Sequence, residues 1–198
     1  MTDMPFFIAD NPALDFLNSI AQPSDEVIDW LSDGHRFVEW LRLSAMIPDD
    51  QADRFQAMPQ EALEDVTEQA RVLREWLRGV VARNAGRDQV TLTEGEARYL
   101  NGLLAQDHRF FQVHADPCHL HETRDWSDPM SLLMPVAASV AHLLAEADIW
   151  HVKNCEGPTC TMWFEDKTKN RKRRWCTMSI CGNRAKAAAF RARKKAQA

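Results

Sequence analysis

The sequence predicts a mostly α-helical protein: a helical N-terminal domain with a small β-hairpin, followed by a treble-clef-like zinc finger made of a hairpin and a basic helix. Three observations lead to this prediction. Apolar residues recur every three or four positions over long stretches, residues 109–126 alternate as strands do, and two cysteine pairs lie near the C-terminus. The chain has 198 residues, 45% of them hydrophobic, which suits one domain of about 150 residues plus a small addition. We therefore predict domains over residues 1–148 and 149–198.

Charge is distributed unevenly along the chain. Residues 1–150 contain 11 Lys and Arg against 26 Asp and Glu, a net charge of −15. Residues 151–198 contain 13 against 3, a net charge of +10, and the two values sum to −5. A basic segment on an acidic body predicts a polyanionic partner such as nucleic acid, with an unstructured basic tail as the alternative. No apolar run reaches the roughly 18 residues that span a bilayer, and no signal peptide is recognised, so we expect a cytoplasmic protein without a membrane partner.

The first two helices are predicted from apolar residues at helical spacing. One is expected over residues 27–47, with Ser32 and Asp33 as its cap, and the Pro48-Asp49-Asp50 run is expected to end it. The next is expected over about residues 59–84. Charges of both signs alternate on its outer face, which is typical of a solvated helix and not of a site.

Two further helices flank the predicted β-hairpin. Residues 93–96 form a capping box, which starts a helix that should end near residue 105. Residues 109–126 form two short alternating stretches joined by a turn, which predicts the hairpin. Asp128 should cap an apolar helix that runs through residue 144, in which Pro135 marks a kink or the true start.

Four of the five cysteines form two close pairs. They are Cys155, Cys160, Cys176 and Cys181, in the pattern C-x4-C, 15 residues, C-x4-C. Two turns separated by a loop bring four thiolates to one centre, as a tetrahedral zinc ion requires, and a reducing compartment favours metal over disulfides. Four thiolates leave no open coordination position, so we expect one structural Zn²⁺ without a catalytic role. Buried, unliganded thiols are the alternative.

The remaining cysteine, Cys118, lies in the predicted hairpin among His114, His119 and His121. Because alternate strand residues share a face, these histidines could hold a metal, but surface or pocket-lining histidines are the favoured interpretation. Cys118 is expected not to bind the zinc. The sequence contains no P-loop, no dinucleotide-binding glycine motif and no nucleophile elbow, so we do not predict an enzyme.

Basic and aromatic side chains surround the cysteine pairs. Residues 161–164 and 173–175 are predicted strands joined by a turn at 167–172, and residues 184–195 have the composition of a helix. Basic residues on the turn and helix are expected to contact DNA phosphates or base edges. They are Lys169, Arg171, Lys172, Arg173, Arg174, Arg184, Lys186 and Arg191. Trp163, Trp175 and Phe190 should form a small core, with base stacking as the alternative.

These residues resemble the CGNR zinc finger family over residues 149–194. The resemblance rests on Cys155, Cys160, Phe164-x-Asp166, Thr168, Asn170, Arg173-Arg174-Trp175-Cys176 and Cys181-Gly182-Asn183-Arg184-x-Lys186. Near the N-terminus, Leu14-Asp15-Phe16-Leu17-Asn18 resembles the early signature of the ABATE domain, with Ser19 where Thr is more usual. The resemblance implies a bacterial stress-induced transcription regulator, in which the finger binds DNA and the N-terminal domain senses a small-molecule effector.

Asp15 and Asn18 are the candidate effector-binding residues, because three-residue spacing puts them on one face of a helix. Hydrogen bonds from this pair to buried backbone groups are the favoured alternative. The predicted function is a DNA-binding transcription regulator. An RNA- or ribosome-associated zinc module, an enzyme with its site in the N-terminal domain, and an interaction adaptor are the alternatives. Because a small finger has few base-reading side chains, we expect a homodimer that binds two half-sites.

Overall fold

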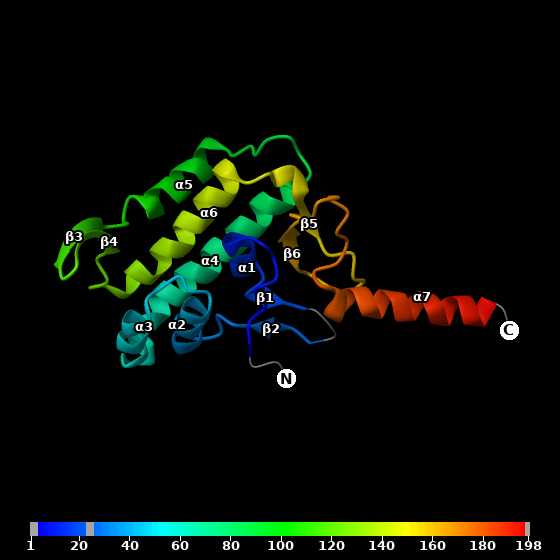
Figure 1. The fold of residues 1–198 in the computed structure, drawn as a ribbon, viewed down its shortest axis with the longest axis horizontal. Helices are drawn as coiled ribbons and strands as arrows, with labels where there is room; N and C mark the ends of the chain where they lie inside the picture. The colour runs from blue at the N-terminus through cyan, green and yellow to red at the C-terminus, as the bar shows by residue number, and fades with distance from the viewer. Residues whose placement is uncertain (1–3, 23–25, 197–198) are drawn as a thin grey trace.

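The computed structural model describes residues 4–22 and 26–196, and they form a helical body joined to a small C-terminal segment (Figure 1). We call the described residues up to 148 the body and residues 149–196 the finger segment. The helices of the body are α1 (Pro12–Leu17), α2 (Gly34–Leu43), α3 (Asp49–Gln56), α4 (Gln60–Asn84), α5 (Glu94–Leu104) and α6 (Met134–Glu146). Mostly α structure with small antiparallel sheets confirms the predicted fold class.

Helix α4 is the longest element and carries the apolar face that the sequence predicts. Leu63, Ala70, Leu73 and Leu77 are fully buried, and α1, α2 and the 3-10 turn η1 (Pro129–Leu133) pack against the helix. Each buried leucine contributes roughly 1.5–3 kcal/mol by leaving water. The core therefore centres on α4, and α5 packs beside α6 at its edge.

The predicted helix over residues 27–47 is too long at both ends, because α2 spans only Gly34–Leu43, and the larger error is at its start. Strand β2 (Ile28–Asp29) pairs antiparallel with β1 (Ile20–Ala21), and α2 begins only at Gly34, where the Asp33 side chain accepts the Arg36 N–H. The cause lies on α4. The buried Arg74 guanidinium donates to both carboxylate oxygens of Asp29, at 2.8 and 3.0 Å, and this ion pair fixes residue 29 in an extended conformation.

The expected break after α2 is instead the start of α3. Pro48 occupies the N-cap position, and Asp49 and Asp50 lie in the first turn of the helix. Proline is tolerated at helix starts, where a free N–H is not needed, and acidic side chains there interact favourably with the helix dipole. The same three residues therefore begin a helix.

The two elements around the hairpin begin as predicted. Thr93 and Glu96 form both hydrogen bonds of the capping box at the start of α5. Asp128 accepts the Met130 N–H at 2.7 Å at the start of η1, and Pro135 lies in the first turn of α6, so it marks the true start of that α-helix.

Segment Pro129–Glu146 is long and apolar enough to cross a membrane by length and composition, which the search for apolar runs in the sequence missed. Half of it is buried inside the structure. Val136, Val140 and Leu143 contribute to the hydrophobic core. The burial is that of a core helix.

The predicted hairpin is confirmed. Strands β3 (Arg109–Ala115) and β4 (Cys118–Arg124) pair antiparallel from Arg109↔Arg124 to Ala115↔Cys118. The hairpin extends from one end of the molecule as a separate arm (Figure 1). At its base, the Asp107 carboxylate accepts from the guanidinium groups of Arg109 and Arg124, at 2.8 and 2.5 Å.

The finger segment contains β5 (Val152–Asn154), β6 (Trp163–Glu165), the π-helical turn η3 (Met178–Gly182) and α7 (Asn183–Ala196). Strand β6 packs against α1, and one hydrophobic core includes Leu14 of α1 and Phe164 of β6. Helix α7 begins at η3 and projects away from the body (Figure 1). The sequence predicted this helix but not the turn before it.

Candidate metal centre and basic surface

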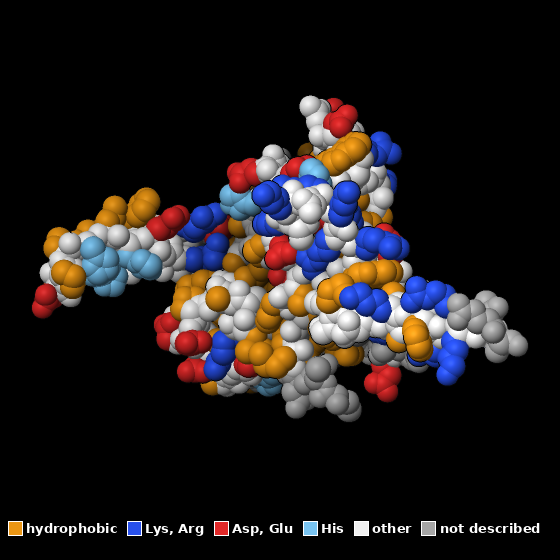
Figure 2. Space-filling model, turned by 45° about the vertical axis from the view of Figure 1, so that its right-hand side comes forward, with side chains coloured by type: hydrophobic (Ala, Val, Ile, Leu, Met, Phe, Trp, Pro, Cys, Tyr) orange, Lys and Arg blue, Asp and Glu red, His pale blue; other side chains and the backbone are white. Residues whose placement is uncertain are grey.

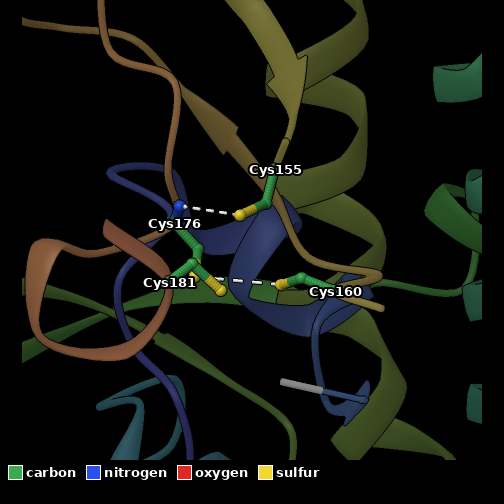
Figure 3. Close-up of side chains that lie close together, drawn as sticks. All are labelled: Cys155, Cys160, Cys176 and Cys181. Carbon is green, nitrogen blue, oxygen red and sulfur yellow. Dashed lines mark hydrogen bonds between the residues drawn. The ribbon is translucent and has the colours of Figure 1, made fainter. Parts of the chain in front are cut away.

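The four paired cysteines converge in the structure (Figure 3). Cys155 directly follows β5, Cys160 lies in the turn between β5 and β6, Cys176 precedes η3, and Cys181 lies within η3. All four are buried, and their sulfur atoms lie within 4.8 Å of one another. Segments 21 residues apart thus deliver their thiols to one point, as the spacing of the pairs predicts.

The geometry of this cysteine cluster fits a tetrahedral zinc ion. Zinc–sulfur bonds of about 2.3 Å place the sulfurs of a tetrahedral site about 3.8 Å apart. The Sγ atoms of Cys160 and Cys176 are 3.9 Å apart. The Cys176 N–H donates to the Sγ of Cys155 at 3.2 Å, and such donors stabilise a thiolate that binds metal. The cluster can therefore hold one ion with all four positions filled by sulfur.

Without a cation, the four sulfurs cannot all carry charge. Hydrogen bonds from the thiols of Cys160 and Cys176 lower the pKa of Cys155 to about 2. The hydrogen bond with Cys155 raises the pKa of Cys160 to about 12, and hydrogen bonds to both neighbours, with burial, raise the pKa of Cys176. One thiolate thus suppresses ionisation of its neighbours, and a divalent cation supplies the charge that lets all four ionise.

Gly157 lets the first cysteine turn close against the cluster. A Cβ at this position would lie 2.9 Å from the Cβ of Cys160 and 3.0 Å from the Sγ of Cys181. Neither atom can retreat without moving a sulfur away from the centre. A larger residue at position 157 would therefore disturb two ligand positions at once.

The predicted hairpin of the finger segment is wrong in its second strand. Strand β6 pairs with β5, in the register Val152↔Glu165 to Asn154↔Trp163, and residues 173–175 form no strand. The buried Asp166 carboxylate explains the difference. It accepts the N–H groups of Thr168 and Arg173, at 3.1 and 2.8 Å, so residues 167–173 curve around it and do not form a ladder.

Lys153 completes the Asp166 centre. Its ammonium group donates to Asp166 Oδ2 at 2.6 Å and to the Arg171 carbonyl at 2.7 Å. Although burial raises the pKa of Asp166, hydrogen bonds from Lys153 and Thr168 outweigh it, so that the pKa lies below its usual value. Asp166 is therefore a charged, structural group. The role of Lys153 could not be recognised from the sequence, because a single lysine before the first cysteine has no distinctive spacing.

Arg173 attaches the finger segment to the N-terminal segment of the body. Its guanidinium group donates to the Asp10 carboxylate at 2.5 Å and to the carbonyls of Ile8 and Cys176, and lies 4.1 Å above the Phe164 ring. The side chain is only 16% exposed. Although the sequence placed Arg173 among the DNA-contacting residues, the structure surrounds it with protein acceptors.

Asp15 and Asn18 lie in the same contact between body and finger segment. The Asn18 amide accepts the Trp163 N–H at 2.9 Å and donates to the Trp163 carbonyl at 2.8 Å. Asp15 accepts the N–H groups of Ile8 and Ala9, both at 2.9 Å, and burial raises its pKa to about 6. Asn18 thus binds the backbone of the finger segment directly, whereas Asp15 holds Ile8 and Ala9, whose carbonyls accept from Arg173 and from the Glu165 N–H.

Arg174 differs from its neighbour. It pairs with Glu156, at 2.5 Å, and lies 4.9 Å above the Trp175 ring. Its side chain is 62% exposed. An open hollow of about 580 Å³ adjoins it, lined also by Lys172, Trp175 and Met178.

The other basic residues expected at DNA are exposed. They are Lys169, Arg171, Lys172, Arg184, Lys186 and Arg191. Arg171 also donates to the Asp166 carbonyl. Basic side chains gather along α7 and over the turn beside it (Figure 2). Trp163 and Trp175 pack against the core, as the sequence predicts. Phe190 does not, because 63% of it is exposed.

Two family models match the chain. The model of the ABATE family, described as "Putative stress-induced transcription regulator", matches residues 10–147, and that of the CGNR zinc finger matches residues 151–194. No curated protein matches the chain. The four buried cysteines lie within the matched finger and form the site of one structural zinc ion. The chain therefore belongs to the ABATE family of regulatory proteins and carries a C-terminal CGNR zinc finger.

Proposed function

We propose that this protein is a cytoplasmic transcription regulator that binds duplex DNA through α7 and the basic turn beside the zinc site. The exposed α7 is the observation that carries the proposal. This helix has 14 residues, none of its described side chains is buried, and it contains no Asp or Glu. Helices of this length are marginal in water without a packing partner, so α7 gains stability where it docks.

The major groove of DNA fits such a helix. The groove is about 12 Å wide, admits one α-helix, and is bordered by phosphates that Lys and Arg neutralise. Zinc fixes only the beginning of α7, through Cys181, and leaves the rest of the helix projecting into solvent. Helix α7 therefore serves as the base-reading element and the zinc site as its mount.

Within the basic residues we assign two roles. Arg174 and Lys172, beside the hollow near the zinc site, bind phosphate together with Lys169, while Arg184, Lys186 and Arg191 approach DNA from α7. Arg171 and Arg173 hold the turn and the body, because protein carbonyl and carboxylate groups already accept from them. A homodimer supplies the second half-site that a single finger lacks.

We place the two domains at residues 1–148 and 149–198. Effector sensing is supported by a hollow that lies where the second domain attaches to the first. This hollow, of about 370 Å³, is lined by Ile20, Ala21, Gln22, Val27, Glu75, Arg78 and Thr161. Thr161 belongs to the finger segment, and the Gln22 N–H donates to its hydroxyl at 3.0 Å. A small molecule bound there would contact both parts, and its binding energy would bias how the finger is held.

The test uses the full chain, loaded with one zinc ion. Duplexes are selected from random DNA, and affinity for the selected duplex is compared with affinity for structured RNA at matched salt. A shared sequence bound more tightly than RNA supports the proposal. Tighter binding to RNA, or no enrichment of any sequence, contradicts it.

Variants locate the surface. Lys186→Ala on α7 should weaken binding of the selected duplex by about tenfold or more if Lys186 contacts a base or desolvated phosphate. Arg98→Ala is the matched control, because Arg98 is an exposed basic residue on α5, in the body. An equal loss in both variants would indicate non-specific charge attraction, and a loss only in Arg98→Ala would move the surface to the body.

A further inference from the structure

The β3–β4 hairpin has two chemically different faces. Its register pairs His114 with His119 and Gln112 with His121, and directly paired residues share a face. The opposite face carries Phe111, Val113 and Leu120, which are all exposed. Figure 2 shows the histidines as one pale-blue patch on the protruding arm. Three imidazoles from two strands thus share a small, accessible surface.

The spacing of the rings suits a common ligand. The ring centres of His114 and His119 are 4.8 Å apart, and those of His114 and His121 are 5.9 Å apart. Two imidazoles that bind one tetrahedral ion at about 2.0–2.1 Å have ring centres about 5 Å apart. His114 and His119 now stack at 10°, so a ligand arrangement needs one ring to rotate about its side-chain torsions. Exposed side chains make such rotations in picoseconds to nanoseconds, and the backbone need not move.

His119 is already oriented as a metal ligand. Its Nδ1 lies 2.8 Å from the Pro117 carbonyl oxygen, and a carbonyl only accepts, so Nδ1 carries the proton. The lone pair then lies on Nε2. Histidines that bind metal commonly donate their other ring N–H to a backbone carbonyl in this way, which fixes both tautomer and ring orientation.

The surroundings select the class of metal. In the register of β3 and β4, the His face holds Phe110, Gln112 and Thr123 beside the three histidines, and no carboxylate. Glu122 and Cys118 alternate onto the other face. Imidazole nitrogens suit zinc, nickel and copper, whereas magnesium and calcium require oxygen ligands.

We propose that His114, His119 and His121 form a second metal site, which binds one divalent late transition-metal ion such as Zn²⁺ and clips β3 to β4. Water completes the coordination. This site goes beyond the proposed function, since it lies in the body and uses none of the cysteines. It also adds a further cross-strand link to a solvated two-stranded sheet, a structure that is only marginally stable by itself.

The experiment uses untagged full-length protein that holds one zinc ion at the cysteines. Native mass spectrometry and calorimetry follow the addition of Zn²⁺. We expect a second equivalent to bind and the amide protons of β3 and β4 to exchange more slowly once it has bound. Each of His114→Gln, His119→Gln and His121→Gln should weaken this second site by about tenfold or more, with the first zinc retained.

Two substitutions outside the proposed site serve as controls. Cys118→Ser, on the other face, and His142→Gln, an exposed histidine on α6, should leave the second equivalent unchanged. Absence of a second equivalent overturns the proposal, as does a second equivalent that survives all three hairpin substitutions together. Half an equivalent with metal-dependent dimerisation would show that two chains share the ion, which also overturns a site within one chain. None of these results depends on DNA binding.

Discussion

The finger segment and the β3–β4 hairpin are both small β structures, yet they are held in opposite ways. Strands β5 and β6 have three residues each, but they pack on α1, surround a buried aspartate and adjoin four buried cysteines. Strands β3 and β4 have seven residues each and are exposed along almost their whole length. The length of a strand therefore does not indicate how firmly it is held, because the short strands are the ones fixed by metal ligands and buried polar groups.

Removal of the zinc should break this comparison most strongly. Cys176→Ser, or a chelator, should abolish zinc binding and unfold the finger segment, because zinc binding free energy, on the order of 10 kcal/mol in small fingers, is also folding free energy. Zinc content and the circular dichroism of α7 would report the loss. Cys118→Ser on the hairpin is the matched control and should change neither. Full zinc content in Cys176→Ser would contradict the assignment of the ligands.

Substitution of Arg173 should affect the attachment of the finger segment to the body, whereas substitution of Arg174 should affect DNA binding. Arg173→Ala should lower the free energy of unfolding by about 2 kcal/mol, because it leaves the part-buried carbonyls of Ile8 and Cys176 without their charged donor. Arg174→Ala should leave stability almost unchanged, since its ion pair with Glu156 is exposed, but should weaken DNA binding by about tenfold. Denaturant unfolding and a binding assay on both variants give the answer. Equal stability losses would remove the distinction.

Asp15 should make the stability of the folded chain sensitive to pH. Its pKa is about 6 in the folded chain against 3.8 in the reference state, so between about pH 4 and 6 the folded state binds more protons than the unfolded state. This group therefore reduces stability as pH rises through that window, by on the order of 3 kcal/mol. Asp15→Asn should remove that contribution. The unfolding free energy of the variant minus that of the parent should therefore increase from pH 4 to pH 6. A constant difference would contradict the raised pKa.

The end of α7 should show the smallest effect. Lys194 and Lys195 lie in the last turn of an unpacked helix. Alanine at either position should lower DNA affinity slightly, by the same factor for every DNA sequence. The slope of log affinity against log salt should fall by about one for each phosphate contact that is lost. Titrations at several salt concentrations measure this slope. A loss confined to the selected sequence would instead place these lysines at base edges.

Local patterns predicted much of this structure. Helix α4 follows from its apolar repeat, α5 from its capping box, and the zinc ligands from the spacing of the two cysteine pairs, because each signal lies within the element that it describes. The sequence also predicted the hairpin and α7.

The missed features depend on partners far away in the chain. The start of α2 is set by Arg74, 45 residues after Asp29, and β6 is held by Asn18, 145 residues before Trp163. Three-residue strands carry too few residues for an alternating pattern to show. The division between Arg173 and Arg174 was equally hidden, because only the fold brings Asp10 to one and Glu156 to the other.

The projection of α7 also sets how far a bound polyanion can stay from the acidic body, which carries charge of the same sign. A helix of 14 residues spans about 21 Å, whereas ionic screening reduces electrostatic forces over about 8 Å at physiological salt. A polyanion that lies across the outer turns of α7 is thus separated by more than one screening length from the acidic part of the chain, where residues 1–150 carry a net charge of −15. For a polyanion held on these outer turns alone, α7 acts as a spacer, so that repulsion by the body becomes significant only in dilute buffer.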